Sequence, residues 1–228
     1  MTAEAAPIRV AVVGTGAISQ VVHIPILGER EDVELVALAD TDRPKAETIA
    51  RRFGVAEVIQ PDEALSREDL DAVVISTPNS LHEDMAVRAL ESGKHVFVER
   101  PIALTSAGAT RVVEAAREAG TSLVVGLPHR FRPEVSALRS FVAGGELGDL
   151  HAVRSSWLTR QVPLMRPTWR QDREVAGGGA LIDLGVSALD LSLWIVDFPA
   201  IRRVSCIARW GEYAVEDAAT MLFESHEG

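Results

Sequence analysis

The stretch IRVAVVGTGAIS, residues 8–19, decides the fold. Its first six residues form an apolar run rich in valine, which is typical of a strand buried on both faces. Gly14 permits a tight turn directly after this strand, and Gly16 lets the phosphates of a ligand approach the backbone closely. Ala17 and Ile18 begin a helix whose first amides are unpaired and attract negative charge. The stretch predicts a strand, a phosphate-binding turn and a helix, and a plain tight turn is the alternative.

The third glycine position of the dinucleotide-binding pattern is occupied by Ser19, which is small enough for close helix packing but is a weaker match. From here to Gly126, short apolar runs alternate with amphipathic segments. This alternation predicts a parallel, doubly wound α/β sheet of the Rossmann type, because crossovers between parallel strands are right-handed. We expect residues 1–126 to form an NAD(P)-binding domain. The predicted strands are IRVAVV, VELVALA, DAVVIS, HVFV and SLVV, and the predicted helices are PKAETIARRFG, LHEDMAVRALESG and TSAGATRVVEAAREAG.

After Gly126 the pattern changes, and we expect residues 127–228 to form a partial α+β domain for substrate binding and oligomerisation. Its predicted helices lie in residues 133–148 and 180–197, and its predicted strands in residues 150–158, 202–210 and 218–225. A sheet this small has an open edge and little apolar cover. The domain is therefore unusually small, or it borrows a partner, or the polypeptide is shortened. If it borrows a partner, the open sheet favours a homo-oligomer.

The bulk composition excludes several classes of protein. A chain of 228 residues with 47% hydrophobic and 25% charged residues is ordinary for a packed protein, and a net charge of -10 argues against nucleic acid and anionic membranes as partners. Cys206 is the single cysteine, so there is no internal disulfide or cysteine-based metal site, and we interpret it as a small core residue. No window approaches the about 20 apolar residues of a membrane-spanning helix. We expect a cytoplasmic protein without a metal.

Asp40 ends the second predicted strand. A carboxylate there can accept hydrogen bonds from both hydroxyls of an adenosine ribose, and its charge repels an additional 2′-phosphate. This favours NAD as the cofactor, with NADP as the alternative. Arg43 is close enough in sequence to clamp a phosphate, whereas a helix cap at Thr41 or Asp42 explains the same turn without a ligand.

Two further motifs follow predicted strands, and ligands of such sheets collect at the carboxyl ends of the strands. STPNSLH (residues 76–82) follows one strand and VERP (residues 98–101) follows the next. A helix cap by Asn79 or Ser80 is the alternative for the first motif. The residues that we expect to line the cofactor crevice are Thr77, Pro78, Asn79, His82, Glu99 and Arg100.

The predicted helix after the glycines at residues 177–179 carries a polar stripe. Asp183, Ser187, Asp190 and Trp194 recur at spacings of four, three and four residues, so they share one face. Carboxylates on an apolar helix must face a partner, water or a site. A salt bridge to an arginine of residues 159–173 is the alternative for either aspartate.

In this order, GTGAIS, VALAD, STPNSLH, VERP, HRFRP and GGGALIDLGVSALD resemble the motifs of the Gfo/Idh/MocA family of nicotinamide-dependent oxidoreductases. The resemblance covers the chain from Ile8 onward. It implies a Rossmann domain that binds NAD or NADP and an α+β domain that holds a sugar, inositol or related polyol. It also implies hydride transfer between the nicotinamide and a hydroxyl-bearing carbon, with Glu99 and Arg100 beside the reactive ring.

The sequence departs from the family at two positions that handle protons, where Arg100 replaces the usual lysine and Ser187 the usual histidine, and we expect a second domain shorter than the family's. Arginine stays charged and serine is a poor acid or base. Arg100 is therefore assigned to substrate binding and charge stabilisation, and the proton to Asp183, His129 or a water held by Ser187. A second interpretation is an NAD(P)-binding sensor or accessory subunit, or an inactive family member.

The expected substrate-binding residues are His129, Arg130, Trp169, Arg170 and Asp183. Each has a structural alternative. His129 and His82 can equally be hydrogen-bonded histidines of the fold. Trp169 and Arg170 can equally form a stack at the surface.

Overall fold

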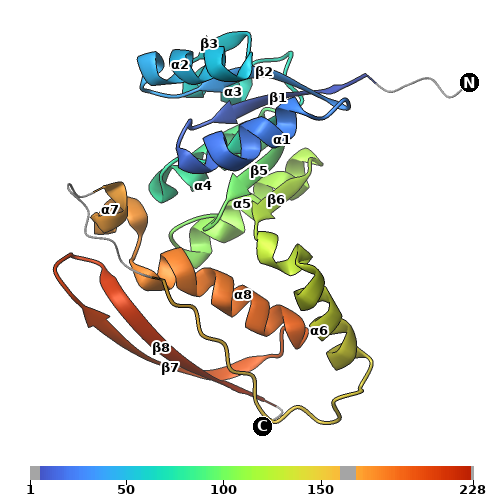
Figure 1. Ribbon diagram of the computed structural model, residues 1–228, viewed down its shortest axis with the longest axis vertical. Helices are drawn as coiled ribbons and strands as arrows, with labels where there is room; N and C mark the ends of the chain where they lie inside the picture. Colours follow the sequence, from blue (N-terminus) through green and yellow to red (C-terminus); the bar gives the residue numbers. More distant parts are fainter. Residues whose placement is uncertain (1–5, 160–167, 227–228) are drawn as a thin grey trace, which may run out of the picture. The chain divides into compact units, whose positions relative to one another are not determined.

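The computed structural model describes residues 6–159 and 168–226. The chain divides into two compact units, of which the first ends at Gly126 and the second begins at Leu127. The first unit is a parallel sheet with helices, and the second combines helices with a two-stranded antiparallel sheet (Figure 1). The predicted combination of an α/β and an α+β part is confirmed.

The first unit is built on a six-stranded sheet with the strand order β3-β2-β1-β4-β5-β6. All neighbouring strands run parallel. The chain winds in one direction from β1 to β3 and in the other from β4 to β6, so the switch point lies between β1 and β4, as in a Rossmann sheet. The strands are β1 (Ile8–Val13), β2 (Val33–Ala39), β3 (Glu57–Ile59), β4 (Ala72–Ile75), β5 (His95–Glu99) and β6 (Leu123–Gly126).

The strand β3 is absent from the sequence prediction. It has three residues and lies at the edge of the sheet, where it pairs only with β2. An edge strand of this length needs no long apolar run, and the period-2 signal of three residues is too weak to detect.

The helices of this unit begin and end at residues that fit helix caps. α2 (Arg43–Phe53) starts at Asp42, whose side chain accepts a hydrogen bond from the Lys45 amide, and it stops at Gly54 in the left-handed conformation. α5 (Ser106–Ala119) starts at Thr105 and stops at Gly120 in the same way. Further helical segments are the π-turn η1 (Ser19–His23), α1 (Ile24–Gly28), α3 (Pro61–Ser66), the 3₁₀ turn η2 (Asn79–Leu81) and α4 (His82–Glu91).

The sheet buries apolar side chains on both faces. Along β1, Val13 belongs to a cluster with residues of α3, α4 and α5, whereas Val12 belongs to a cluster with residues of α1 and α2. This alternation follows from the period of two along a strand. The loops at the ends of the strands are therefore mounted on a rigid, close-packed platform.

The described part of the second unit contains two of the three predicted strands and the predicted apolar helix. β7 and β8 pair antiparallel, with Cys206 opposite Met221. The elements are the 3₁₀ turn η3 (Pro128–Phe131), α6 (Pro133–Ala143), the 3₁₀ turn η4 (Trp169–Gln171), α7 (Arg173–Ala176), the π-turn η5 (Leu181–Gly185), α8 (Val186–Ile195), β7 (Ile201–Trp210) and β8 (Glu216–Ser225).

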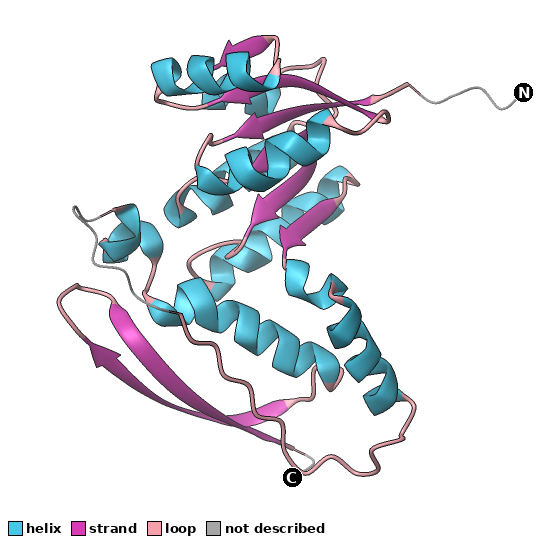
Figure 2. Cartoon of the chain, in the orientation of Figure 1, coloured by secondary structure: helices cyan, strands magenta, loops and turns pink. Residues whose placement is uncertain are grey.

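The predicted strand at residues 150–158 is wrong. This segment is a loop (Figure 2). Its alternating side chains satisfy the strand pattern, but a strand also needs a neighbour for its backbone N–H and C=O groups. In the described part of this unit, the two strands of the sheet pair with each other.

The glycines before α8 are explained by the close approach of β8. A Cβ at Gly179 would clash with the backbone oxygen of Glu216, so glycine is required there. The carboxylate of Glu216 accepts a hydrogen bond from the Leu181 amide, at 2.9 Å from N to Oε1. Glu216 therefore satisfies one of the first amides of the helix, which otherwise lack a partner.

Most apolar side chains of the second unit are exposed or half-buried. Among the described residues of this unit, only Ala176, Gly179, Ser187 and Val215 are buried. Cys206, predicted to be a core residue, is exposed, because a sheet of two strands covers little of its own surface.

One helical run corrects the expectation about membrane-spanning segments. Arg173–Ile195 is long and apolar enough to cross a membrane, judged by length and composition alone. Apolar helices of soluble proteins meet the same criterion, so the finding is weak support for a membrane.

Candidate functional site

The turn after β1 is held against two neighbouring strands by Gly14. The φ angle of Gly14 is 93°, and a Cβ there would lie 2.7 Å from the carbonyl oxygen of Ser76, just after β4. The Gly14 amide donates to the carbonyl of Ala39 on β2, at 2.7 Å. A side chain at this position would strain the backbone and collide with β4. Gly14 therefore sets the path of the turn.

Gly16, Ala17 and Ile18 form the exposed rim of the same turn. A Cβ at Gly16 would meet no heavy atom of the described chain within 4 Å, so the packing of the protein does not require a glycine there. The helix that follows starts at residue 17, and its first amides have no carbonyl one turn earlier to bind. Open space beside bare amides at a helix N-terminus suits a pyrophosphate. The turn therefore fits a dinucleotide.

Ser19 contributes a hydroxyl that a third glycine would lack. Its side chain is fully buried, its Oγ donates to the carbonyl of Gly14 at 2.5 Å, and it lies 2.5 Å from the Oγ of Ser76. Ser19 thus ties the turn to the end of β4. The sequence predicted a weaker fit at this position, whereas the structure shows an additional contact.

Asp40 lies directly after β2 and is joined to the turn. Its Oδ2 accepts hydrogen bonds from the amide of Thr15 at 2.8 Å and from the Thr15 hydroxyl at 2.6 Å, and its Oδ1 accepts one from the Asp42 amide at 2.9 Å. Burial raises the pKa of Asp40, but the hydrogen bonds from Lys45, Thr15 and the Asp42 amide outweigh it and lower the pKa below its ordinary value. An ionised carboxylate therefore stands where Rossmann folds contact the adenosine ribose.

Two cations in the first turn of α2 have different partners. Arg43 donates from Nε to Oε1 of Glu47 at 2.9 Å, on the exposed side of the helix. The Nζ of Lys45 lies 2.8 Å from Oδ2 of Asp40. The structure therefore brings Lys45, and not the predicted Arg43, to the acidic residue of the candidate site.

His82 is buried between two backbone carbonyls. Its Nδ1 lies 2.7 Å from the carbonyl oxygen of Pro101, and its Nε2 lies 2.8 Å from that of Thr77. The ring is 1% exposed. His82 thus connects the segments that follow β4 and β5, which is the structural alternative, and a contact of His82 with a cofactor stays a prediction.

The remaining residues of this motif lie beside the end of β4. The Thr77 hydroxyl donates to the sulfur of Met85 at 3.7 Å. The cap positions of η2 and α4 are Pro78 and Leu81, and neither caps its helix with a side chain. Asn79 is 9% exposed. Contacts of Thr77, Pro78 and Asn79 with a cofactor stay predictions.

Glu99 ends β5 at the same edge of the sheet, and its carboxylate lies between His23 and Gly126. Its Oε1 lies 2.8 Å from Nε2 of His23, whose ring packs edge-on against Phe97 at 5.2 Å between centroids. A Cβ at Gly126 would lie 2.9 Å from the other carboxylate oxygen. Arg100 follows, partly exposed, and is joined to the next residue by a cis peptide. His23 thus lies at the candidate site, although no local pattern of the sequence indicated it.

In the second unit, Arg130 forms a two-pronged ion pair with Asp190. Its Nε donates to Oδ2 at 2.8 Å and its Nη2 donates to Oδ1. The guanidinium also lies over the rings of Trp194 and Phe198, at 5.9 and 5.5 Å from their centroids. The pair raises the pKa of Arg130 further above its ordinary range. Asp190 therefore forms a salt bridge, which was the alternative to a role in a site. Its partner is an arginine of η3, and not one of residues 159–173.

Other predicted substrate residues of this unit make aromatic contacts. The ring of His129 packs edge-on against Trp157, at 4.5 Å between centroids. The guanidinium of Arg170 lies 4.5 Å from the ring centroid of Trp169, which is the surface stack named as the alternative. Trp169 and Tyr213 also line an open hollow of about 740 Å³. Substrate contacts at these positions stay predictions.

The predicted polar stripe on the apolar helix begins within the π-turn η5. A π-turn closes its hydrogen bonds from residue i to i+5, so the helix departs here from the regular α-helical repeat on which the prediction was based. Asp183 is exposed, whereas Ser187 is 3% exposed. The surroundings of the two residues therefore differ, and both the shared face and their assignment to the proton stay predictions.

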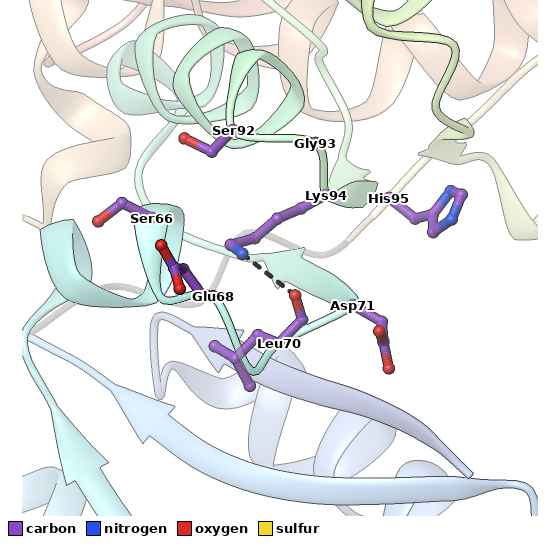
Figure 3. Close-up of a pocket in the computed structure, with 8 residues that line it drawn as sticks. All are labelled: Ser66, Glu68, Leu70, Asp71, Ser92, Gly93, Lys94 and His95. Atoms are coloured by element: carbon purple, nitrogen blue, oxygen red, sulfur yellow. Dashed lines mark hydrogen bonds between the residues drawn. The ribbon is translucent and has the colours of Figure 1, made fainter. Parts of the chain in front are cut away.

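A separate hollow of about 310 Å³ lies at the opposite, amino edge of the sheet (Figure 3). The Lys94 side chain is 2% exposed, and its Nζ donates to the carbonyls of Arg67 at 2.5 Å and Leu70 at 3.1 Å. Burial lowers the pKa of Lys94. Lys94 is a structural cation, and this hollow lies at the edge of the sheet opposite the turn at residues 14–19. Its lining residues are Ser66, Glu68, Leu70, Asp71, Ser92, Gly93, Lys94 and His95.

The carboxyl edge of the first sheet therefore gathers most of the predicted cofactor residues. Within residues 6–159 and 168–226, no group of three or more His, Cys, Asp or Glu side chains could hold a metal ion. Thr15, His23 and Lys45 are additions from the structure. The predicted residues at this edge are Gly14, Gly16, Ala17, Ile18, Asp40, Thr77, Pro78, Asn79, Glu99 and Arg100.

Comparison with known families gives two matches along the chain. Residues 8–127 match the oxidoreductase family with an NAD-binding Rossmann fold, and residues 135–228 match the GFO/IDH/MocA C-terminal domain. The chain is 33% identical over 242 aligned residues to D-glucoside 3-dehydrogenase of Escherichia coli (strain K12). The alignment covers 97% of this chain and 68% of that protein.

Two solved structures are similar over nearly the whole chain. GenD2 from gentamicin A biosynthesis, in complex with NAD, has a TM-score of 0.86 at 30% identity and covers 98% of this chain and 64% of its own. KijD10, a 3-ketoreductase from Actinomadura kijaniata in complex with TDP-benzene and NADP, has a TM-score of 0.88 at 28% identity and covers 97% and 67%. The chain thus spans about two thirds of the length of these relatives. It belongs to the Gfo/Idh/MocA family of NAD-binding oxidoreductases.

Proposed function

We propose that this chain acts in an NAD(P)-dependent oxidoreductase that transfers hydride between the nicotinamide and a hydroxyl-bearing carbon of a sugar, inositol or related polyol. The observation that carries the proposal is the turn at residues 14–19. The packing of the protein requires a glycine at position 14. It does not require one at position 16, which borders open space. A glycine without a packing reason, at the start of a helix whose first amides have no carbonyl partner within the helix, fits a bound phosphate group.

The residues of the first unit would bind and orient the cofactor. The amides at Gly16, Ala17 and Ile18 would hold the pyrophosphate, and Asp40 would accept a hydrogen bond from the adenosine ribose. Once bound, the nicotinamide accepts or donates the hydride. Glu99, held by His23 at 2.8 Å, would shape the same edge of the sheet.

For each alcohol that is oxidised, one hydride leaves the carbon and one proton leaves the hydroxyl. Arg100 would polarise the substrate oxygen, because a guanidinium binds a developing negative charge but keeps its own protons. Asp183 is our candidate for the proton, with His129 or a water held by Ser187 as alternatives.

Hydride transfer is tested by incubating the chain with NAD or NADP and a panel of glycosides, inositols and other polyols. The E. coli relative, a D-glucoside 3-dehydrogenase, justifies including glucosides. We expect the absorbance of reduced nicotinamide to rise with at least one substrate. Arg100→Lys should increase the rate, because lysine can exchange a proton where arginine cannot.

A non-catalytic dinucleotide sensor or accessory subunit is the second candidate. Arg100 and Ser187 stand at the positions where the family usually has lysine and histidine, and Ser187 is 3% exposed. This candidate would be favoured if the wild type and Arg100→Lys both bind a dinucleotide, but no substrate of the panel reduces the bound nicotinamide in either protein.

We also propose that the protein is a cytoplasmic homo-oligomer associating through the β7–β8 hairpin. Ile207 is 79% exposed and Leu222 is 70% exposed, and the register places them diagonally on one face of the hairpin. Covering such a face would remove apolar surface from water. A single cysteine and a net charge of -10 support a cytoplasmic location. Light scattering should show a species larger than one chain, and Ile207→Glu should reduce it to one.

A further inference from the structure

The carboxylate of Asp40 is more heavily engaged than a free ribose acceptor would be. Its Oδ2 receives the amide and hydroxyl of Thr15 and the ammonium of Lys45, and its Oδ1 receives the amide of Asp42. Each carboxylate oxygen has two acceptor sites. Oδ1 therefore retains room for one ribose hydroxyl, while Oδ2 is committed to the protein.

The ammonium of Lys45 changes the charge of this subsite. It lies 2.8 Å from Oδ2, and its side chain is 40% exposed. An opposite charge at this distance offsets the repulsion that a bare carboxylate exerts on a phosphate. An ammonium has three N–H donors, so those not directed at Asp40 can serve a ligand. The N-terminus of α2, where Lys45 lies, adds a further favourable field for an anion.

Asp42 keeps the offset partial. Its side chain accepts a hydrogen bond from the Lys45 amide at 3.1 Å, so a second carboxylate stands close to the same helix turn. This part of the chain therefore carries one carboxylate that is paired with the Lys45 ammonium and a second one that is not shown paired with it. The subsite should tolerate a 2′-phosphate without requiring it.

Arg43 provides a matched control within the same helix turn. It carries the same charge two positions earlier, but its guanidinium binds Glu47 at 2.9 Å and its side chain is 58% exposed. A general effect of positive charge would act through both residues. An effect of the pair with Asp40 would act through Lys45 alone.

Building on the proposed NAD(P) site, we propose that Lys45 is a specificity-determining residue that offsets the charge of Asp40 and lets the adenosine subsite accept NADP as well as NAD. The ammonium would donate to the 2′-phosphate of NADP. In NAD the same position carries a hydroxyl, which Oδ1 of Asp40 can accept.

The test is a calorimetric measurement of Kd for NAD and for NADP with the full chain and three variants. For the wild type we expect the two Kd values to lie within about tenfold of each other. Lys45→Met should weaken NADP by about tenfold or more and change NAD by less than about threefold. Lys45→Arg should restore NADP binding, and Arg43→Met should leave the NADP/NAD ratio of Kd values unchanged. A thermal melt of each variant confirms that it is folded.

The outcomes separate this inference from the proposed function. If the wild type binds NAD but discriminates against NADP by far more than tenfold, the inference is wrong. It is also wrong if Lys45→Met weakens both dinucleotides equally, or if Arg43→Met shifts the ratio as much as Lys45→Met does. If the folded wild type binds neither dinucleotide, the proposed function itself fails.

Discussion

The two units of the chain differ in how they use their apolar residues. In the first unit, the strands are buried on both faces, and Val12 and Leu38 have no exposed surface. In the second unit, Ile207 and Leu222 stand open to solvent. The first unit therefore holds the turn at residues 14–19 by its own close packing. The second depends on fewer local contacts, such as the ion pair between Arg130 and Asp190 and the approach of Glu216 to the glycines.

The largest expected effect is that of Gly14→Ala on the first unit. The left-handed φ and the collision with the Ser76 carbonyl should together cost about 3 kcal/mol or more. All 4 tryptophans lie after residue 126, so fluorescence reports on the second unit, whereas circular dichroism reports on both. We expect the circular dichroism signal of the first unit to be lost at a lower urea concentration in the variant than in the wild type. The fluorescence transition, which reports on the second unit, should not move. A fluorescence transition that moves equally would mean that the units unfold as one.

Gly179→Ala is the converse test in the second unit. Its Cβ would collide with the backbone of β8, so we expect a loss of roughly 2–3 kcal/mol. Here the tryptophan fluorescence transition should move, while NAD affinity should not, because the proposed pyrophosphate and ribose contacts lie in the first unit. Loss of NAD binding in this variant would contradict the expectation that the first unit binds NAD independently of the stability of the second unit.

Arg130→Met should have a smaller effect on the second unit. The variant leaves Asp190, whose side chain is 10% exposed, without its partner, and we expect a loss of about 2 kcal/mol in the fluorescence transition. Arg139→Met is the control, since Arg139 pairs with the exposed Asp197 and should contribute less than about 1 kcal/mol. Equal effects of the two variants would show that the burial of the pair is unimportant.

Asp40→Asn should have the smallest effect on stability and should depend on pH. The pKa of Asp40 is lowered in the folded state, so its contribution is present above the unfolded pKa and disappears as the pH falls through the folded pKa. We expect the wild type to exceed the variant by about 1–2 kcal/mol near neutral pH. The difference should shrink in acid, and a difference that grows in acid would contradict the hydrogen bonds to Thr15 and Asp42.

The sequence predicted the parts of the fold and site that local patterns encode. The apolar runs located the long strands, and the positions of Gly14, Gly16 and Asp40 followed from where those runs end. The sequence did not indicate Thr15, His23 or Lys45, because their contacts depend on how the folded chain brings segments together. His23, for example, meets Glu99, which lies 76 residues later. A polar residue between two glycines is the one local signal that could have indicated Thr15.

The errors in the second unit have a common cause. Residues 150–158 carry a strand pattern, and Cys206 is a residue type that favours the core, but both predictions require neighbouring elements that local sequence does not specify. The helix prediction for residues 180–197 was based on the spacing of a regular α-helix. Such spacing does not reveal the π-turn before Ser187.

The central claim is that the turn at residues 14–19 binds a dinucleotide, and calorimetry on the wild type and Gly16→Val tests it most directly. A side chain at position 16 enters space that the protein leaves open, so the variant should melt like the wild type. We predict heat of binding with NAD for the wild type and none for the variant. Undiminished binding by a folded Gly16→Val, or no heat with either dinucleotide for the wild type, would contradict the claim.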